Sequence, residues 1–198
     1  MLGRWAGIPD VTSRTWADVP IEPDNSDWTW VLERPCLECG FDASTFPAVQ
    51  VAELIRSNAA AWGRLLAAAP EDLRRRPSDE RWSVLEYACH VRDVFRLYGE
   101  RLDLMLRQDD PLYPNWDQDA TAVEDDYNGQ DPARVAVELQ DAALRLAEAF
   151  ERVHGAQWQR RGGRSDGARF TVDTFSRYLA HDPVHHLYDV TGERVGTT

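Results

Sequence analysis

Four long stretches of the chain carry apolar residues at the three-and-four spacing of a buried helix face, and this pattern restricts the fold most strongly. The stretches cover residues 47–69, 83–107, 132–154 and about 171–190. Ser83 and Glu86 predict a capping box before the second stretch, and the pair Asp131-Pro132 is typical of a helix start. No run of alternating polar and apolar residues predicts an extended sheet. The pattern therefore predicts an all-α protein, an antiparallel four-helix bundle.

The first 46 residues lack this periodicity and are predicted to form an irregular arm. The segment contains prolines at positions 9, 20, 23 and 35 and tryptophans at positions 5, 16, 28 and 30. Four tryptophans on a disordered tail would leave large apolar surfaces in water, so we expect an ordered arm that packs against the bundle. A chain of 198 residues with 43% apolar content buries one sizeable core. We therefore predict an arm over residues 1–46 and the bundle over residues 47–198.

Two of the predicted connections between helices have an unusual composition. Residues 108–131 contain eight acidic residues and no basic one, together with Tyr113, Trp116 and Tyr127. We predict a long loop here, and loops of this length in compact domains are usually either functional or disordered. Residues 160–167 are rich in glycine and predict a turn with room for a short hairpin.

The charge of the chain excludes several classes of partner. The formal net charge is −12, and all 22 basic residues are arginine. Such a surface repels phosphate, so we expect no binding to nucleic acid or to an anionic membrane. The absence of lysine excludes Schiff-base chemistry through a lysine side chain. No segment resembles a signal peptide or approaches the roughly 20 apolar residues of a membrane span, which predicts a cytoplasmic protein.

The histidines are few and clustered. Of five in the chain, His181, His185 and His186 lie within six positions, and His90 lies in the second predicted helix. Two imidazoles four residues apart on a helix point the same way, so His90, His181 and His185 would form a metal-binding face. Three such ligands leave positions open for water or substrate, which favours catalysis. The alternative is a group of partly buried or surface histidines without a metal.

Pro183 complicates this arrangement, because proline deletes a helix hydrogen bond and clashes with the preceding turn. Either the last helix kinks at this position, or a new helix starts there with Asp182 as its cap. In the second case His181 and His185 need not share a face. His186 lies about 100° further round the helix and is the alternative ligand.

Cys36 and Cys39 form a CxxC pair in the arm. This spacing is typical of half a zinc site or of a redox pair, and the sequence contains no second CxxC. Cys89 would contribute a ligand if the arm folds back, and is otherwise a small buried residue. The pair is therefore a candidate second thiol site with a metal-binding or a redox role.

Two motifs carry a resemblance to a known family. The sequence WSVLEYACHV at residues 82–91 and the sequence YLAHDPVHHLYDV at residues 178–190, separated by the acidic aromatic loop, resemble the DinB superfamily of metal-binding four-helix proteins. The resemblance covers about residues 47–190. It implies a divalent metal, most often zinc or nickel, held by His90, His181 and His185. It also implies kinship with mycothiol-dependent maleylpyruvate isomerases and with thiol S-transferases.

The resemblance implies a metal-dependent enzyme that uses a low-molecular-weight thiol, such as mycothiol, in S-transfer or isomerisation of a small electrophile. Trp116 and Tyr127 are expected to line its pocket, and a homodimer is expected. The alternative is a non-catalytic metal-binding or redox-sensing module whose arm docks a partner. An enzyme should have a pocket above an open metal position, whereas a module should have a saturated or empty histidine site.

Overall fold

The structure is a computed structural model that describes residues 27–68, 72–78 and 80–195. Its α-helices are α1 Val51–Ala68, α2 Val84–Arg107, α3 Gln118–Glu124, α4 Pro132–Glu151 and α5 Val172–Thr191. Short 3-10 helices cover Trp28–Leu32 (η3), Ala48–Gln50 (η4), Tyr127–Gly129 (η5) and Gly155–Gln159 (η6), and the strands are β1 Leu112–Tyr113, β2 Arg161–Arg164 and β3 Arg169–Thr171. Within the described ranges no helix combines the length and the apolarity that a membrane crossing requires.

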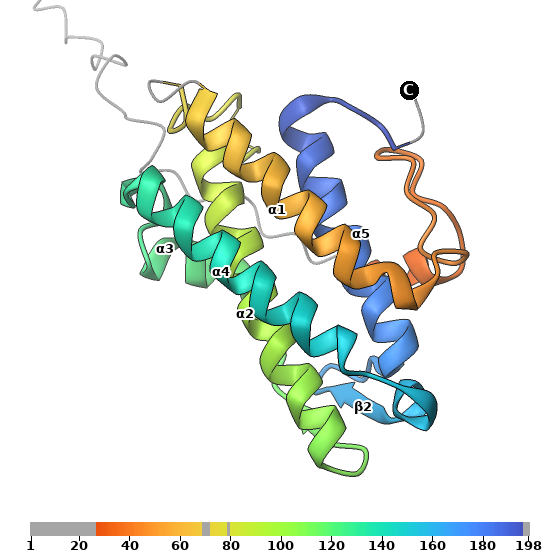
Figure 1. Cartoon of the computed structure of the whole chain (residues 1–198). Coiled ribbons are helices and arrows are strands. Elements are labelled where there is room, and N and C mark those ends of the chain that lie inside the picture. Colours follow the sequence, from red (N-terminus) through yellow and green to blue (C-terminus); the bar gives the residue numbers. More distant parts are fainter. Residues whose placement is uncertain (1–26, 69–71, 79, 196–198) are drawn as a thin grey trace, which may run out of the picture.

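The four long helices α1, α2, α4 and α5 form the predicted bundle (Figure 1). Contacts between helices give their directions. Arg56 of α1 pairs with Glu151 near the end of α4, so these two helices are antiparallel. Arg92 of α2 instead pairs with Glu138 in the first half of α4, and these two helices run in the same direction. The long connection between α2 and α4 explains this, because it returns the chain to the end of the bundle where α2 began.

A small sheet covers one end of the bundle. β2 and β3 pair in an antiparallel hairpin, as the glycine-rich turn allowed, and β1 pairs parallel to β2. The close approach of β2 to α2 requires glycine: a Cβ atom on Gly162 would lie 2.7 Å from Cγ of Met105. The prediction of a mainly helical bundle is thus confirmed, with a three-stranded sheet added among the described residues.

The connection over residues 108–131 contains more structure than predicted. Instead of one long loop it contains β1, α3 and η5. The helix α3 begins where the Asp117 side chain accepts a hydrogen bond from the backbone N–H of Ala120. Such a cap is a known start signal for a helix. The helix that follows is too short to show a clear apolar face, so the periodicity of apolar residues did not predict α3.

Pro183 neither starts a new helix nor ends one. It lies inside α5, which continues to Thr191 and ends at Gly192 in the left-handed conformation. The Pro183 carbonyl accepts a 2.7 Å hydrogen bond from Nδ2 of Asn58 on α1, which holds this turn of α5 against the bundle. Because α5 is continuous, residues four apart on either side of Pro183 share a face.

The described part of the arm, residues 27–46, packs on the bundle. Val31, Cys36, Cys39, Phe41 and Ala43 are buried and join the same hydrophobic core as the helices. The η3 helix in this segment contacts α5. The predicted roles of Trp5 and Trp16 lie outside the described residues, and the proposed boundary at residue 46 stays a prediction.

Candidate metal centre

The helix α5 carries two pairs of possible metal ligands in adjacent turns. Asp182 and His186 are four residues apart and face one way, and His181 and His185 are four residues apart and face another. The two pairs are offset by one residue, which corresponds to about 100° around the helix. As a result, α5 presents one pair toward α2 and the other toward the arm.

The first pair meets His90 of α2, and we call His90, Asp182 and His186 the His90 cluster. Nε2 of His90 lies 3.6 Å and Nε2 of His186 lies 3.8 Å from Oδ1 of Asp182. These separations are too long for hydrogen bonds but suit atoms that share one ion, because ligands at about 2.1 Å from a tetrahedral metal lie roughly 3.4 Å apart. The residues of this cluster therefore fit a divalent metal.

Several polar atoms of the His90 cluster are buried without a hydrogen-bond partner. Both ring nitrogens of His90 and Oδ1 of Asp182 are in this state among the described side chains. Leaving such atoms unsatisfied is costly, and a bound cation would satisfy them. Trp116 stacks on the His90 ring with its centroid 5.3 Å away and the two planes 7° apart, which fixes the orientation of the imidazole.

The electrostatics of this cluster favour the protonation states that bind metal. Burial lowers the pKa of His90, so the imidazole is neutral at pH 7. Burial of Asp182 acts to raise its pKa, but the neighbouring His186 and His90 outweigh this and lower it to about 2. Neutral imidazole and ionised carboxylate are the forms in which these side chains coordinate a cation.

Asp189 supports His186 from the side opposite the cluster. Oδ2 of Asp189 lies 3.0 Å from Nδ1 of His186. A carboxylate at this nitrogen holds the proton on Nδ1 and leaves Nε2, the atom nearest Asp182, free to bind a metal. The same arrangement of carboxylate, histidine and metal orients ligands in many zinc sites.

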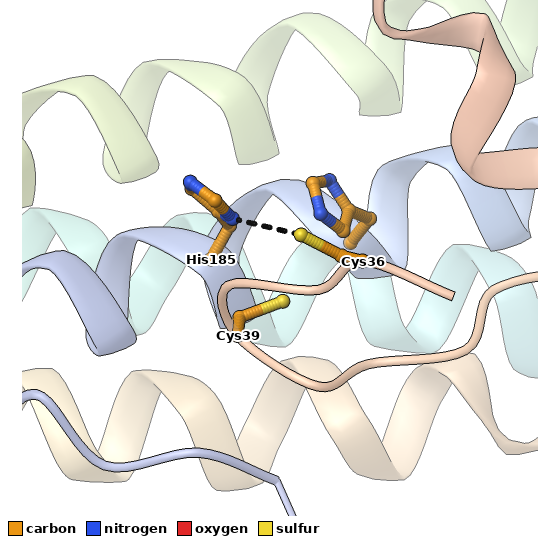
Figure 2. Close-up of side chains that lie close together, drawn as sticks. Cys36, Cys39 and His185 are labelled. Atoms are coloured by element: carbon orange, nitrogen blue, oxygen red, sulfur yellow. Dashed lines mark hydrogen bonds between the residues drawn. The ribbon is translucent and has the colours of Figure 1, made fainter. Parts of the chain in front are cut away.

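The second pair on α5 meets the arm. Ligand atoms of Cys36, Cys39, His181 and His185, which we call the Cys36 cluster, all lie within 4.8 Å of one another, and all four residues are buried. Figure 2 shows the Cys36 sulfur beside the ring of His185, with Cys39 on the same loop. Sγ of Cys36 lies 3.6 Å from Nδ1 of His185. The arm thus supplies two sulfurs and α5 supplies two imidazoles.

Burial also shifts the titration of the Cys36 cluster. It raises the pKa of the Cys39 thiol to about 12 and lowers the pKa of His181 to about 4. Reactive redox cysteines have a lowered pKa instead. Cys89 lies apart from this group, with its sulfur 3.7 Å from the carbonyl oxygen of Tyr127, and is a buried residue of the core.

The structure thus divides the predicted ligand set. His181 and His185 lie together, but among the described residues His90 falls in a different cluster, with His186, the alternative ligand, and with Asp182. Sequence reasoning assigned Asp182 only a capping role. The signal that would have found it is the pair Asp182 and His186, which has the same four-residue spacing as His181 and His185.

A cavity of about 940 Å³ opens beside the two clusters. Asp182 and His186 line it on one side, together with His181 and His185. Trp116 lines it as predicted, whereas Tyr127 is buried under α2 and donates a hydrogen bond from its hydroxyl to Asp93. Two further tryptophans, Trp28 of the arm and Trp82 before α2, complete an aromatic wall.

The cavity is strongly acidic. Its described lining includes seven carboxylate residues: Asp27, Glu80, Asp117, Asp119, Asp166, Asp182 and Asp189. Arg164 is the basic residue in that lining, and it already pairs with Asp166 at 2.7 Å and donates to the Tyr178 hydroxyl at 3.3 Å. The wall therefore suits a cation, or a neutral ligand rich in hydroxyl donors, better than an anion.

With this geometry in view, comparison with known proteins identifies the family. The DinB superfamily matches residues 53–190, which is more than half of the chain and includes α2, α5 except its last residue, and all the histidines of both clusters. The chain belongs to the DinB superfamily. No match to this chain was found among curated proteins.

Comparison of structures supports the same fold. YfiT from Bacillus subtilis, described as a probable metal-dependent hydrolase with an unusual four-helix bundle topology, is similar to this DinB protein with a TM-score of 0.62. The two sequences are 19% identical, and the match covers 76% of this chain and 85% of YfiT. At this identity the similarity establishes the fold alone.

Proposed function

We propose that this DinB protein is a metal-dependent enzyme in which a divalent metal bound by the His90 cluster activates a low-molecular-weight thiol. The observation that carries the proposal is the position of that cluster. It offers three ligands, and two of them, Asp182 and His186, line the cavity. Three protein ligands beside a cavity are typical of catalytic metal sites, which keep a coordination position for substrate.

The donor set limits the metal. Two imidazoles and one carboxylate suit zinc, nickel or iron(II). Such an ion would supply Lewis-acid chemistry, lowering the pKa of a thiol that reaches it. The chain's own residues contribute orientation: Asp189 fixes the tautomer of His186, and Trp116 fixes the plane of His90.

The chemistry of the cavity favours an uncharged thiol that carries sugar-like hydroxyl groups, which is the character of mycothiol. Tryptophan faces stack on the apolar faces of sugar rings, and carboxylates accept hydrogen bonds from hydroxyl groups. Trp28, Trp82 and Trp116 and the acidic side chains supply both features. The same carboxylates would repel an anionic thiol, because their shared charge makes the cavity negative.

The proposed reaction forms a bond between the thiol sulfur and an electrophilic carbon. The thiol proton leaves to a cavity carboxylate, and the sulfur electron pair forms the new bond. In S-transfer, the leaving group departs with the electron pair of its own bond. In isomerisation, the thiol adds to a double bond, the substrate rotates, and loss of the thiol restores both the double bond and the free cosubstrate.

The test is a thiol-consumption assay with mycothiol and a panel of epoxides and unsaturated carbonyl compounds, combined with elemental analysis. We expect His90→Ala and Asp182→Asn to lose one metal equivalent and to lose turnover. His154→Ala, which removes an exposed histidine outside both clusters, is the matched control and should keep metal and turnover. Equal turnover in Asp182→Asn and the parent, or cleavage of the electrophile by water at the same rate without thiol, contradicts the proposal.

A further inference from the structure

The Cys36 cluster offers four candidate metal ligands, whereas the His90 cluster offers three. Two sulfurs and two imidazoles are the four ligands of a closed Cys2His2 zinc site, which leaves no position for substrate. The CxxC spacing of Cys36 and Cys39 supplies one half, and the four-residue spacing of His181 and His185 on α5 supplies the other. The two further ligands that a lone CxxC lacks are thus present in the fold.

The distances within this cluster suit one shared zinc ion. With Zn–S near 2.3 Å and Zn–N near 2.1 Å, a sulfur and a nitrogen bound to the same tetrahedral zinc lie about 3.6 Å apart. Sγ of Cys36 lies 3.6 Å from Nδ1 of His185. Nε2 of His181 is buried without a hydrogen-bond partner, which is a cost that a ligand atom at a metal does not incur.

The loop that carries the cysteines is shaped to present both sulfurs. The backbone N–H of Gly40 donates to the carbonyl of Cys36 and the N–H of Cys36 donates to the carbonyl of Phe41, both at 2.9 Å, which closes the loop tightly. Gly40 adopts a φ of +79°, a conformation that favours glycine. Figure 2 shows the loop lying against α5 with its two cysteines directed to the histidine side.

Carboxylates surround the outer nitrogen of His185, as they do at other zinc-binding histidines. Nε2 of His185 lies 3.3 Å from Oε2 of Glu38, which is between the two cysteines in sequence, and 3.8 Å from Oδ1 of Asp189. This arrangement holds the proton on Nε2 and leaves Nδ1, the atom beside the Cys36 sulfur, to bind a metal.

We infer that Cys36, Cys39, His181 and His185 bind a structural Zn²⁺ ion, separate from the metal of the His90 cluster, that fastens the arm to α5. The arm positions Trp28, whose ring lies 5.6 Å from that of His181 and 5.3 Å from that of His185, in the wall of the cavity. The inference goes beyond the proposed function and does not depend on it. The structural zinc site and the thiol-dependent activity are separate hypotheses. The experiments below distinguish failure of one from failure of the other.

The first experiment counts zinc in the purified full-length protein by elemental analysis. We expect Cys36→Ser to lose one zinc equivalent that the parent contains. Cys89→Ser, which alters the third buried cysteine away from the cluster, is the matched control and should keep it. A zinc content that Cys36→Ser leaves unchanged, or a Cys36–Cys39 disulfide in the freshly purified protein, overturns the inference.

The second experiment needs no folded cysteine variant. Cobalt(II) replaces zinc in the unmutated protein, and thiolate ligands then give intense sulfur-to-cobalt charge-transfer bands. We expect these bands in the parent and in His90→Ala, and we expect their loss when a mercurial reagent modifies the cysteines and releases the metal. Cobalt bound with nitrogen and oxygen ligands only, and therefore without charge-transfer bands, overturns the inference. Because His90→Ala is expected to keep the bands while losing turnover, failure of one site is distinguishable from failure of the other.

Discussion

At the scale of single residues, Asp189 connects the two clusters. One carboxylate oxygen lies 3.0 Å from Nδ1 of His186 and the other lies 3.8 Å from Nε2 of His185. His186 and His185 belong to different clusters. The shorter contact is a hydrogen bond that orients His186, whereas the longer one only places negative charge beside His185. The carboxylate that orients His186 thus lies on α5, the helix that provides most of the ligands of both clusters.

Asp189→Asn should weaken metal binding at the His90 cluster more than at the Cys36 cluster, because Asp189 hydrogen-bonds His186 but not His185. An amide at this position no longer stabilises the tautomer of His186 that binds the metal through Nε2, and loss of such a partner typically lowers metal affinity about 10–100-fold. Chelator competition on the full-length protein measures the two affinities. Asp173→Asn, in the first turn of the same helix and paired with Arg177, is the control and should bind metal like the parent. Parent-like affinity in Asp189→Asn would show that the carboxylate does not orient His186.

The ligand residues also show how far the sequence alone reaches. Residue type and spacing predicted a metal site of His90, His181 and His185 with His186 as the alternative ligand, and the resemblance implied the same three residues. Their division into two clusters depends on the rotation of α5 about its axis, which packing against α1 and α2 determines. Asp182 was not considered as a candidate ligand because a carboxylate before a proline is typical of a helix cap.

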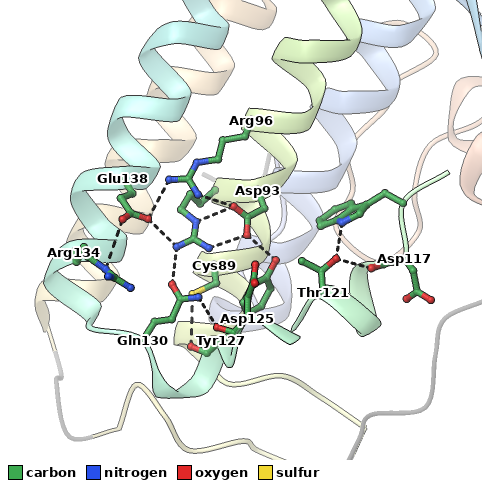
Figure 3. Close-up of polar contacts among 12 residues, drawn as sticks. Cys89, Asp93, Arg96, Asp117, Thr121, Asp125, Tyr127, Gln130, Arg134 and Glu138 are labelled. Atoms are coloured by element: carbon green, nitrogen blue, oxygen red, sulfur yellow. Dashed lines mark hydrogen bonds and ion pairs between the residues drawn. The ribbon is translucent and has the colours of Figure 1, made fainter. Parts of the chain in front are cut away.

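At the scale of elements, a partly buried ion-pair network connects α2 with α4 and η5. Asp93 accepts hydrogen bonds from Arg92 at 2.8 Å and from the Tyr127 hydroxyl at 2.7 Å (Figure 3). Arg92 also pairs with Glu138 of α4 at 3.0 Å. Arg92 and Asp93 follow His90 within one turn of α2, so the network holds the part of α2 that presents this histidine to α5.

Asp93→Asn should destabilise the protein at neutral pH. Burial acts to raise the pKa of Asp93, but the hydrogen bonds and charge of Arg92 outweigh it and lower the pKa. A lowered folded-state pKa means that the carboxylate stabilises the fold above its unfolded pKa, near 3.9, and that this contribution is lost as the pH falls through the folded value. We expect the variant to lose about 1–3 kcal/mol in the free energy of unfolding at pH 7. This difference from the parent should become smaller below about pH 4.

Urea unfolding of parent and variant across pH measures this difference. Asp103→Asn breaks an exposed pair with Arg107 on the same helix and is the control. It should change the free energy of unfolding by less than about 0.5 kcal/mol at any pH, because exposed pairs contribute little. If the difference in free energy of unfolding between Asp93→Asn and the parent stays constant from pH 7 to pH 3, the assignment of a lowered pKa to Asp93 is contradicted.

The elements themselves were largely predictable. The capping box of Ser83 and Glu86 and the Asp131 cap are present as expected, because these signals act within one turn of the chain. The sequence left open whether the last helix continues through Pro183 or a new helix starts there, and in the structure α5 continues through it. A local sequence pattern could not predict that α2 and α4 run in the same direction. That direction follows from the path of the connection over residues 108–131.

At the scale of the whole molecule, the described part of the arm (residues 27–46) and the bundle form one hydrophobic core. Arm residues such as Val31 and Phe41 are as buried as those of the helices. The sequence predicted this packing from the tryptophans. It did not predict where the arm would lie, because the Cys36 cluster joins residues about 150 positions apart. If zinc fastens this contact, its removal should free the arm while the helices stay folded.

Hydrogen exchange of the full-length protein with and without a zinc chelator tests this at the level of the whole chain. We expect backbone amides of residues 28–46 to lose protection on chelation, because the contact between arm and α5 then rests on apolar packing alone. Amides in the middle of α2 and α4 should keep theirs, because the core between these helices does not include the cluster. Cys36→Ser should show the same loss without chelator, and Cys89→Ser should not. Uniform loss over arm and helices would mean that the metal holds the entire fold, and unchanged protection of the arm would mean that packing, not zinc, secures it.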